Sequence, residues 1–115
     1  MNENHKDISN FAFKCIDVGK NDKILDIGCG GGVNIEKFLK LTNNHVDGLD
    51  YSEISVGESI KRNQKAVDKG KCKVMQADVS RMPIDDETYD LVSAFETIYF
   101  WPDIENTFKE VSRII

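Results

Sequence analysis

A short apolar run that ends in a cluster of glycines constrains the fold of this chain more than any other feature. The run occupies residues 23–27, and four of the eight glycines in the sequence lie in the next five positions. A run of this kind predicts a buried strand, and the glycines after it predict a tight turn with positive φ angles. Apolar residues then recur at helical spacing over 34–42, so strand, turn and helix are predicted in succession.

The same alternation continues along the chain and predicts an α/β fold. Helical spacing predicts helices over 5–18, 34–42, 52–70 and 102–115, and short apolar runs predict strands over 23–27, 45–50, 72–77 and 90–95. Ser52 and Ser55 both suit the cap of the third helix. The buried face of the last helix is predicted to consist of Ile104, Phe108, Val111 and Ile115. Strands that alternate with helices form parallel sheets, so we expect one domain over residues 1–115.

The net charge and the hydropathy of the chain argue against nucleic acid and membranes as binding partners. The chain of 115 residues has a net charge of −5, which gives no general attraction for nucleic acid or anionic membranes. Six basic residues and one acidic residue lie in 61–73, and we interpret them as a solvated helix face because no aromatic residues are interleaved. No apolar run is long enough to cross a membrane, and the polar N-terminus does not resemble a signal peptide.

The cysteines favour a reducing compartment. Cys15, Cys29 and Cys72 are odd in number and form no C-x-x-C pair, which suits the cytoplasm better than a disulfide framework. The same spacing argues against a zinc site, and we expect no metal.

Polar or glycine-rich sequences follow all four predicted strands. They are Asp26 to Gly32 after the first strand, Asp50-Tyr51 after the second, Asp78-Val79 after the third and Phe95-Glu96 after the fourth. Ligands of doubly wound sheets bind beyond these carboxyl ends. The glycines allow a ligand to approach the backbone closely, and Asp50, 22 residues after Gly28, is placed to accept hydrogen bonds from a ribose diol. The sequence therefore predicts a nucleoside pocket.

The glycine spacing narrows the choice of nucleoside. A dinucleotide fingerprint G-x-G-x-x-G that starts at Gly28 would need glycine at Val33, and one that starts at Gly30 would need it at Ile35. A phosphate-binding Walker loop needs G-K-[ST], but Val33-Asn34 follow Gly32. The spacing is instead D-x-G-x-G-x-G.

Four sequence blocks together resemble class I S-adenosylmethionine-dependent methyltransferases of the type that includes small-molecule and quinone methyltransferases. The blocks are residues 24–32, 48–52, 76–79 and 83–92, in the order and spacing of the family. The resemblance covers residues 20 to 115 and implies a Rossmann-like, doubly wound parallel sheet with strand order 3-2-1-4.

The resemblance also implies a role for individual residues toward S-adenosylmethionine. Gly28, Gly30 and Gly32, with Cys29 in the same loop, would lie beneath the methionine part, and Asp26 would steer its amino group through the loop or a water. Asp50 would hold the ribose hydroxyls and Tyr51 would lie against adenine. Asp78, the Val79 amide and the Phe95 backbone would complete the adenine pocket. Acidic residues suit this ligand because its sulfonium and amino groups are cationic.

Structural roles stay open for several of these residues. The glycines could form only a tight turn, Asp50 and Asp78 could be caps, and Tyr51 could be structural. Cys29 is interpreted as a small packing residue of the loop, because no histidine is close in sequence to act as its base. No general base stands out, so the catalytic residues are unknown; Glu96 is as well suited to a helix cap or a polar lining as to a substrate contact.

The family's domain continues beyond the last helix with further strands, so this chain resembles the cofactor-binding part of the domain. We expect a methyltransferase of a small molecule, with a non-catalytic module that binds S-adenosylmethionine or S-adenosylhomocysteine as the alternative and a nicotinamide dehydrogenase third. Because strand five of the family would cover strand four, we also expect homo-oligomers to form through the edge of residues 91–95.

Overall fold

The computed structural model describes residues 18–94 and 103–115. The described elements are strands β1 (Ile24–Ile27), β2 (Val46–Asp50), β3 (Val74–Gln76) and β4 (Leu91–Ser93), and helices α2 (Val33–Leu39), α3 (Glu53–Arg62), α4 (Gln64–Asp68) and α5 (Ile104–Ile114). All but the last residue of the helix predicted over 5–18 lies outside the described residues, as do Phe95 and Glu96.

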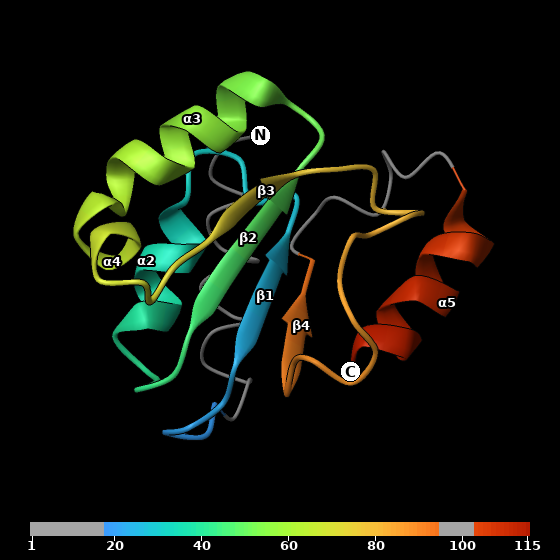
Figure 1. The fold of residues 1–115 in the computed structure, drawn as a ribbon, viewed down its shortest axis with the longest axis horizontal. Helices are drawn as coiled ribbons and strands as arrows, with labels where there is room; N and C mark the ends of the chain where they lie inside the picture. Colours follow the sequence, from blue (N-terminus) through green and yellow to red (C-terminus); the bar gives the residue numbers. More distant parts are fainter. Residues whose placement is uncertain (1–17, 95–102) are drawn as a thin grey trace, which may run out of the picture.

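The four strands form one parallel sheet whose order is β3-β2-β1-β4, as predicted. Ile24 pairs with Val46 of β2 and with Leu91 of β4, and all pairings are parallel. Figure 1 shows the sheet between α2, α3 and α4 on one side and α5 on the other. The parallel pairing brings the carboxyl ends of all strands to one edge, where those predicted binding residues that the structure describes lie.

Successive residues of β1 point to opposite faces of the sheet and divide the core into two clusters. Both faces are covered, and all four residues of β1 are buried. One cluster includes Leu25, Ile27, Leu49, Val79, Met82, Tyr89 and Ile114, and the other includes Ile24, Cys29, Ile35, Phe38, Val46 and Cys72.

The helix predicted over 52–70 is divided into α3 and α4 at Asn63, which has φ −110° and ψ 28°. Ser52 rather than Ser55 caps α3, because the Ser52 side chain accepts a hydrogen bond from the Ser55 amide at 3.3 Å. Gly70 follows α4 with φ 73° and ends the helical segment, as predicted.

The predicted buried face of α5 is wrong in part. Phe108 and Ile115 are about half exposed, whereas Thr107 and Ile114 are completely buried. The segment before β4 fixes the rotation of α5, because the amides of Thr88 and Tyr89 both donate to the Ile114 carbonyl, at 2.8 and 2.9 Å. This anchoring by backbone contacts turns Ile114, rather than Ile115, into the core.

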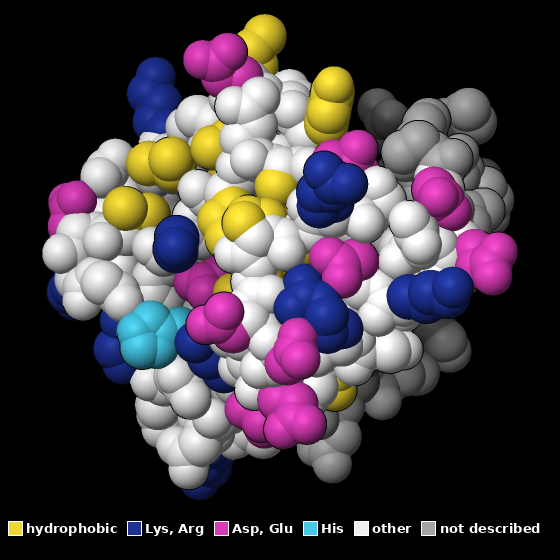
Figure 2. All heavy atoms as spheres, turned by 45° about the vertical axis from the view of Figure 1, so that its right-hand side comes forward, with side chains coloured by type: hydrophobic (Ala, Val, Ile, Leu, Met, Phe, Trp, Pro, Cys, Tyr) yellow, Lys and Arg dark blue, Asp and Glu magenta, His cyan; other side chains and the backbone are white. Residues whose placement is uncertain are grey.

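Acidic and basic side chains are interspersed over the face of the molecule that Figure 2 shows. That face has no single large basic area. Over residues 18–94 and 103–115, no helix is long and apolar enough to span a bilayer.

Candidate functional site

The glycine loop, residues 28–32, crosses the carboxyl end of β2. Gly28, Gly30 and Gly32 have φ angles of 69°, 54° and 86°, which residues with a Cβ atom adopt at a cost. The amides of Gly28 and Cys29 both donate to the Leu49 carbonyl, at 2.7 and 3.2 Å. The loop is therefore fixed to β2 before α2 begins.

Two glycines of the loop are required for different reasons. A Cβ atom at Gly30 would have no neighbour within 4 Å, so the position faces open space. A Cβ atom at Gly32 would lie 2.7 Å from Asn63 Nδ2 and 2.9 Å from Ser59 Cα. Gly32 thus allows α3 to pack against the loop, while Gly30 leaves room on the side where a ligand would bind.

The Cys29 side chain belongs to the core rather than to the open side of the loop. It is buried, and a Cβ atom at Gly48 would lie 3.0 Å from its sulfur. Burial raises the pKa of the Cys29 thiol to about 11, with the charges of Asp26 and Asp50 adding to the effect. The thiol therefore stays protonated, and only the backbone of Cys29 contributes to the loop.

Asp50 is oriented by two backbone amides. One carboxylate oxygen accepts from Gly30 N at 3.0 Å, and the other accepts from Ser52 N at 2.9 Å. The side chain is half-buried at the end of β2. Each oxygen keeps a lone pair, so the carboxylate is held in place and can still accept hydrogen bonds from a ligand diol.

Asp26 is a buried acid with one unused oxygen. Ser93 Oγ donates to Oδ1 at 2.9 Å, while Oδ2 finds no hydrogen-bond partner among the residues that the structure describes. Burial raises the pKa of Asp26 to about 7; the Ser93 hydrogen bond opposes this shift and the charge of Asp50 adds to it. A nearby cation would stabilise the ionised form and satisfy the free oxygen.

The residues predicted to contact adenine differ in their surroundings. Asp78 is partly exposed, and its Oδ1 accepts from the amide and hydroxyl of Ser80, which hold the pKa of Asp78 below its usual value. The Val79 side chain is buried in the core. Tyr51 is 78% exposed and makes little contact with the described part of the chain. Asp78 and Val79 are thus held in place, while the Tyr51 ring is not.

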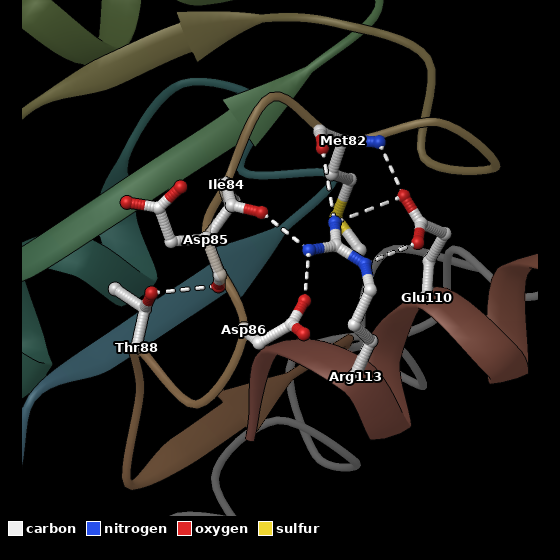
Figure 3. A network of polar contacts seen from close by, with 7 residues as sticks. All are labelled: Met82, Ile84, Asp85, Asp86, Thr88, Glu110 and Arg113. Atoms are coloured by element: carbon white, nitrogen blue, oxygen red, sulfur yellow. Dashed lines mark hydrogen bonds and ion pairs between the residues drawn. The ribbon is translucent and has the colours of Figure 1, made fainter.

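The segment after Asp78 is tied to α5 by Arg113, as Figure 3 shows. The guanidinium donates to the carbonyls of Met82 and Ile84, at 3.1 and 2.6 Å. It also pairs with Glu110 at 2.6 Å and with Asp86 at 2.8 Å. The pairing raises the pKa of Arg113 and lowers that of Glu110. Arg113, together with Glu110, which accepts from the Met82 amide at 2.8 Å, thereby holds the segment that leads from Asp78 to β4.

Sequence reasoning missed four residues that support the site, namely Ser59, Asn63, Ser93 and Arg113. Three of these side chains are short, polar and buried, so helical or strand periodicity gives no signal for them. Within the described ranges, no group of three or more His, Cys, Asp or Glu side chains is arranged to hold a metal ion.

Comparisons with known proteins place the chain among methyltransferases. Residues 24–115 match the family described as methyltransferase domain. A sterol 24-C-methyltransferase of Gibberella zeae is 34% identical over 93 residues, which cover 81% of this chain and 24% of that protein. A cycloartenol-C-24-methyltransferase of Oryza sativa subsp. japonica is 33% identical over 93 residues, which cover 81% of this chain and 27% of that protein.

A solved structure shares the fold at low sequence identity. The S-adenosylmethionine-dependent methyltransferase from Aquifex aeolicus superposes with a TM-score of 0.81 at 19% identity, covering 91% of this chain and 56% of that chain. The chain spans about a quarter of the length of the two curated relatives.

Proposed function

The chain belongs to the methyltransferase-domain family, and we propose that it binds S-adenosylmethionine at the carboxyl ends of its strands as part of a small-molecule methyltransferase. The bound cofactor would supply a sulfonium methyl group, which passes to a nucleophilic acceptor while the electron pair of the broken carbon–sulfur bond stays on sulfur. A small-molecule acceptor is supported by relatives whose names refer to sterol and cycloartenol methylation.

The observation that carries the proposal is the donor set around the glycine loop. Asp26 offers a buried carboxylate oxygen with no hydrogen-bond partner among the described residues, which suits the cationic amino group of the methionine part. Asp50, held by the amides of Gly30 and Ser52, suits the ribose diol. Gly30, whose amide donates to Asp50, has open space where a side chain would lie. These residues bind and orient the cofactor, and positioning supplies much of the acceleration in a displacement of this kind.

Titration calorimetry with S-adenosylhomocysteine tests the binding site. We expect Asp50→Ala to weaken binding by about 1 to 3 kcal/mol, the range for leaving buried polar partners unpaired. Asp50→Asn, which keeps one carbonyl oxygen, should show a smaller loss. Asp85→Ala removes an exposed carboxylate from the segment before β4 and serves as the matched control. Equal affinities for wild type and Asp50→Ala would remove Asp50 from the site.

Methyl transfer is tested separately from binding. The chain is incubated with S-adenosylmethionine labelled in the methyl group and with a cell extract, and label is followed into the lipid and polar small-molecule fractions. Binding with no transferred label would favour the non-catalytic module.

We also propose that copies of the chain associate through β4. Within the described residues β4 pairs with β1 alone. The Leu91 amide donates to the carbonyl of Lys23, the residue before β1, at 3.3 Å. The backbone amide and carbonyl of the next residue, Val92, therefore point away from β1, toward the open edge of the sheet. An open strand edge is a template for pairing. A stable monomer in light scattering at tens of micromolar would contradict this proposal.

We further propose a reducing location such as the cytoplasm. Cys29 and Cys72 are free and buried. Burial raises the pKa of the Cys72 thiol to about 12, so this thiol stays protonated. Localisation of a fluorescent fusion checks the compartment.

A further inference from the structure

Two short polar side chains, one on α3 and one at its carboxyl end, hold the carbonyl groups of the glycine loop. Ser59 and Asn63 are one helical turn apart, and both are buried. Ser59 Oγ donates to the Gly30 carbonyl at 2.5 Å, and Asn63 Nδ2 donates to the Gly32 carbonyl at 3.1 Å. Each side chain thus fixes one peptide group of the loop, while the Cβ position of Gly30 stays open.

Each of the two side chains also makes a second polar contact besides its hydrogen bond to the loop. Ser59 Oγ also lies 3.3 Å from the Cys29 sulfur, and Asn63 Nδ2 also donates to the Ser59 carbonyl at 3.1 Å. A buried polar group costs free energy unless it is hydrogen-bonded, so an apolar side chain would be the simpler occupant of these positions. The polar groups are therefore matched to the loop rather than to the packing of α3 alone.

A loop that contains four glycines has many accessible backbone conformations. Glycine loses more conformational freedom on ordering than any other residue. A ligand that has to order such a loop binds more weakly than one that meets an ordered loop. Hydrogen bonds from supporting residues hold binding groups in the productive geometry before the ligand arrives.

We propose that Ser59 and Asn63 are positioning residues that order the glycine loop for the methionine part of S-adenosylmethionine. The inference rests on the proposed function, because it assigns the loop to that part of the cofactor. It predicts that loss of either hydrogen bond weakens ligands that contain the methionine part and spares ligands that contain adenosine alone.

The test compares two ligands on the same variants. S-adenosylhomocysteine carries both parts, whereas adenosine lacks the amino-acid part. In Ser59→Ala and in Asn63→Asp, which places a carboxylate beside the Gly32 carbonyl, we expect the dissociation constant of S-adenosylhomocysteine to rise about tenfold or more. The dissociation constant of adenosine should change less than about twofold, because the Ser52 amide still holds Asp50 if the Gly30 amide shifts, and Asp78 lies beyond β3.

Thr42→Ala is the matched control for Ser59→Ala. Thr42 is also buried, and its hydroxyl lies 3.1 and 2.6 Å from the carbonyls of Lys20 and Asp22, at the amino end of β1. The Thr42→Ala variant therefore loses a comparable buried hydrogen bond, but at the opposite end of the sheet from the glycine loop. Circular dichroism and thermal unfolding of every variant establish the folded fraction to which the affinities refer.

The outcomes separate the two proposals. If wild type binds S-adenosylhomocysteine but Ser59→Ala weakens both ligands equally, or neither, the positioning role is overturned and the proposed function stands. If wild type binds neither ligand, the proposed function fails and the positioning role fails with it. A tenfold loss confined to S-adenosylhomocysteine in Ser59→Ala, absent in Thr42→Ala, supports both; this holds even if Asn63→Asp does not fold.

Discussion

The two sides of the proposed cofactor site are held together by different kinds of interaction. On the methionine side, the glycine loop is fixed by backbone carbonyls and by neutral, buried side chains of α3. On the adenine side, the segment from Asp78 to β4 is tied to α5 by Arg113 and two carboxylates near the surface. The methionine side is therefore sensitive to side-chain volume, whereas the adenine side is sensitive to ionic strength.

The titratable groups of the two sides also respond to pH in opposite directions. The pKa of Asp26, beneath the glycine loop, is raised by burial. The pKa of Glu110, beside the segment after Asp78, is lowered first by its hydrogen bond with Arg113. Asp26 favours folding at low pH, and Glu110 favours folding at higher pH. Acidification should therefore weaken the interaction of Glu110 with Arg113 on the adenine side. On the methionine side it should remove the cost of burying the charged Asp26 carboxylate.

Substitution of Gly32, on the methionine side, should have the largest effect on the free energy of unfolding. Gly32→Ala introduces a Cβ atom 2.7 Å from Asn63 Nδ2 at a residue whose φ is 86°. Left-handed strain and overpacking together predict a loss of about 2 to 5 kcal/mol in the free energy of unfolding. Gly70→Ala is the control, because Gly70 has φ 73° and open space around it. It should lose only the strain, about 1 to 2 kcal/mol.

Urea denaturation of both variants measures the difference. Equal losses for Gly32→Ala and Gly70→Ala would mean that α3 moves away from the loop at little cost. In that case the close packing of α3 would not be what makes the methionine side rigid.

The next largest effect concerns Asp26 and pH. The folded-state pKa of about 7 lies above the usual value of 3.8. The contribution of Asp26 to stability is therefore fully present below about pH 4 and is lost as pH rises through about 7. In Asp26→Asn the side chain is neutral at every pH. The stability of wild type relative to this variant should fall by about 2 to 4 kcal/mol between pH 4 and pH 8.

Denaturation curves for both proteins across this range provide the measurement. At pH 8, saturating S-adenosylhomocysteine should restore more stability to wild type than to Asp26→Asn, because its amino group is cationic and can pair with the Asp26 carboxylate. Parallel pH profiles for the two proteins would place the titration of Asp26 near its ordinary range and leave its buried oxygen unexplained.

The sequence predicts the strands and the glycine turn of this site better than it predicts the side chains that hold them in place. The strand order, the glycine turn and the parallel arrangement are confirmed, because they depend on local periodicity and on which residues follow each strand. Ser59 and Asn63 appear as ordinary polar positions of a helix. Their importance depends on the contact between α3 and a loop about 30 residues earlier in the chain, which periodicity cannot reveal.

The errors in the helices have the same origin. The helix over 52–70 is interrupted at Asn63, whose side-chain Nδ2 donates to the Gly32 carbonyl. The face of α5 is rotated because the segment before β4 anchors Ile114. Both differences arise from tertiary hydrogen bonds that override helical propensity and apolar spacing.

The smallest predicted effect concerns the adenine side. Arg113→Met keeps the length of the apolar stem but removes the hydrogen bonds to Met82 and Ile84 and the pairs with Glu110 and Asp86. We expect the midpoint of thermal unfolding to fall by a few degrees at low salt, and the difference from wild type to shrink as salt is added.

Lys109→Met is the control. Lys109 lies on the same helix and pairs with Glu105 at 3.9 Å, and both side chains are well exposed. This substitution should therefore have almost no effect on stability. Adenosine affinity, measured by calorimetry, should weaken in Arg113→Met and not in Lys109→Met, since Arg113, unlike Lys109, contacts the segment that follows Asp78 and Val79. An Arg113→Met protein that keeps its adenosine affinity and shows the same salt dependence as wild type would mean that the adenine side is ordered by the apolar contacts of Val79 and Met82. The two sides of the site would then be held by packing alike.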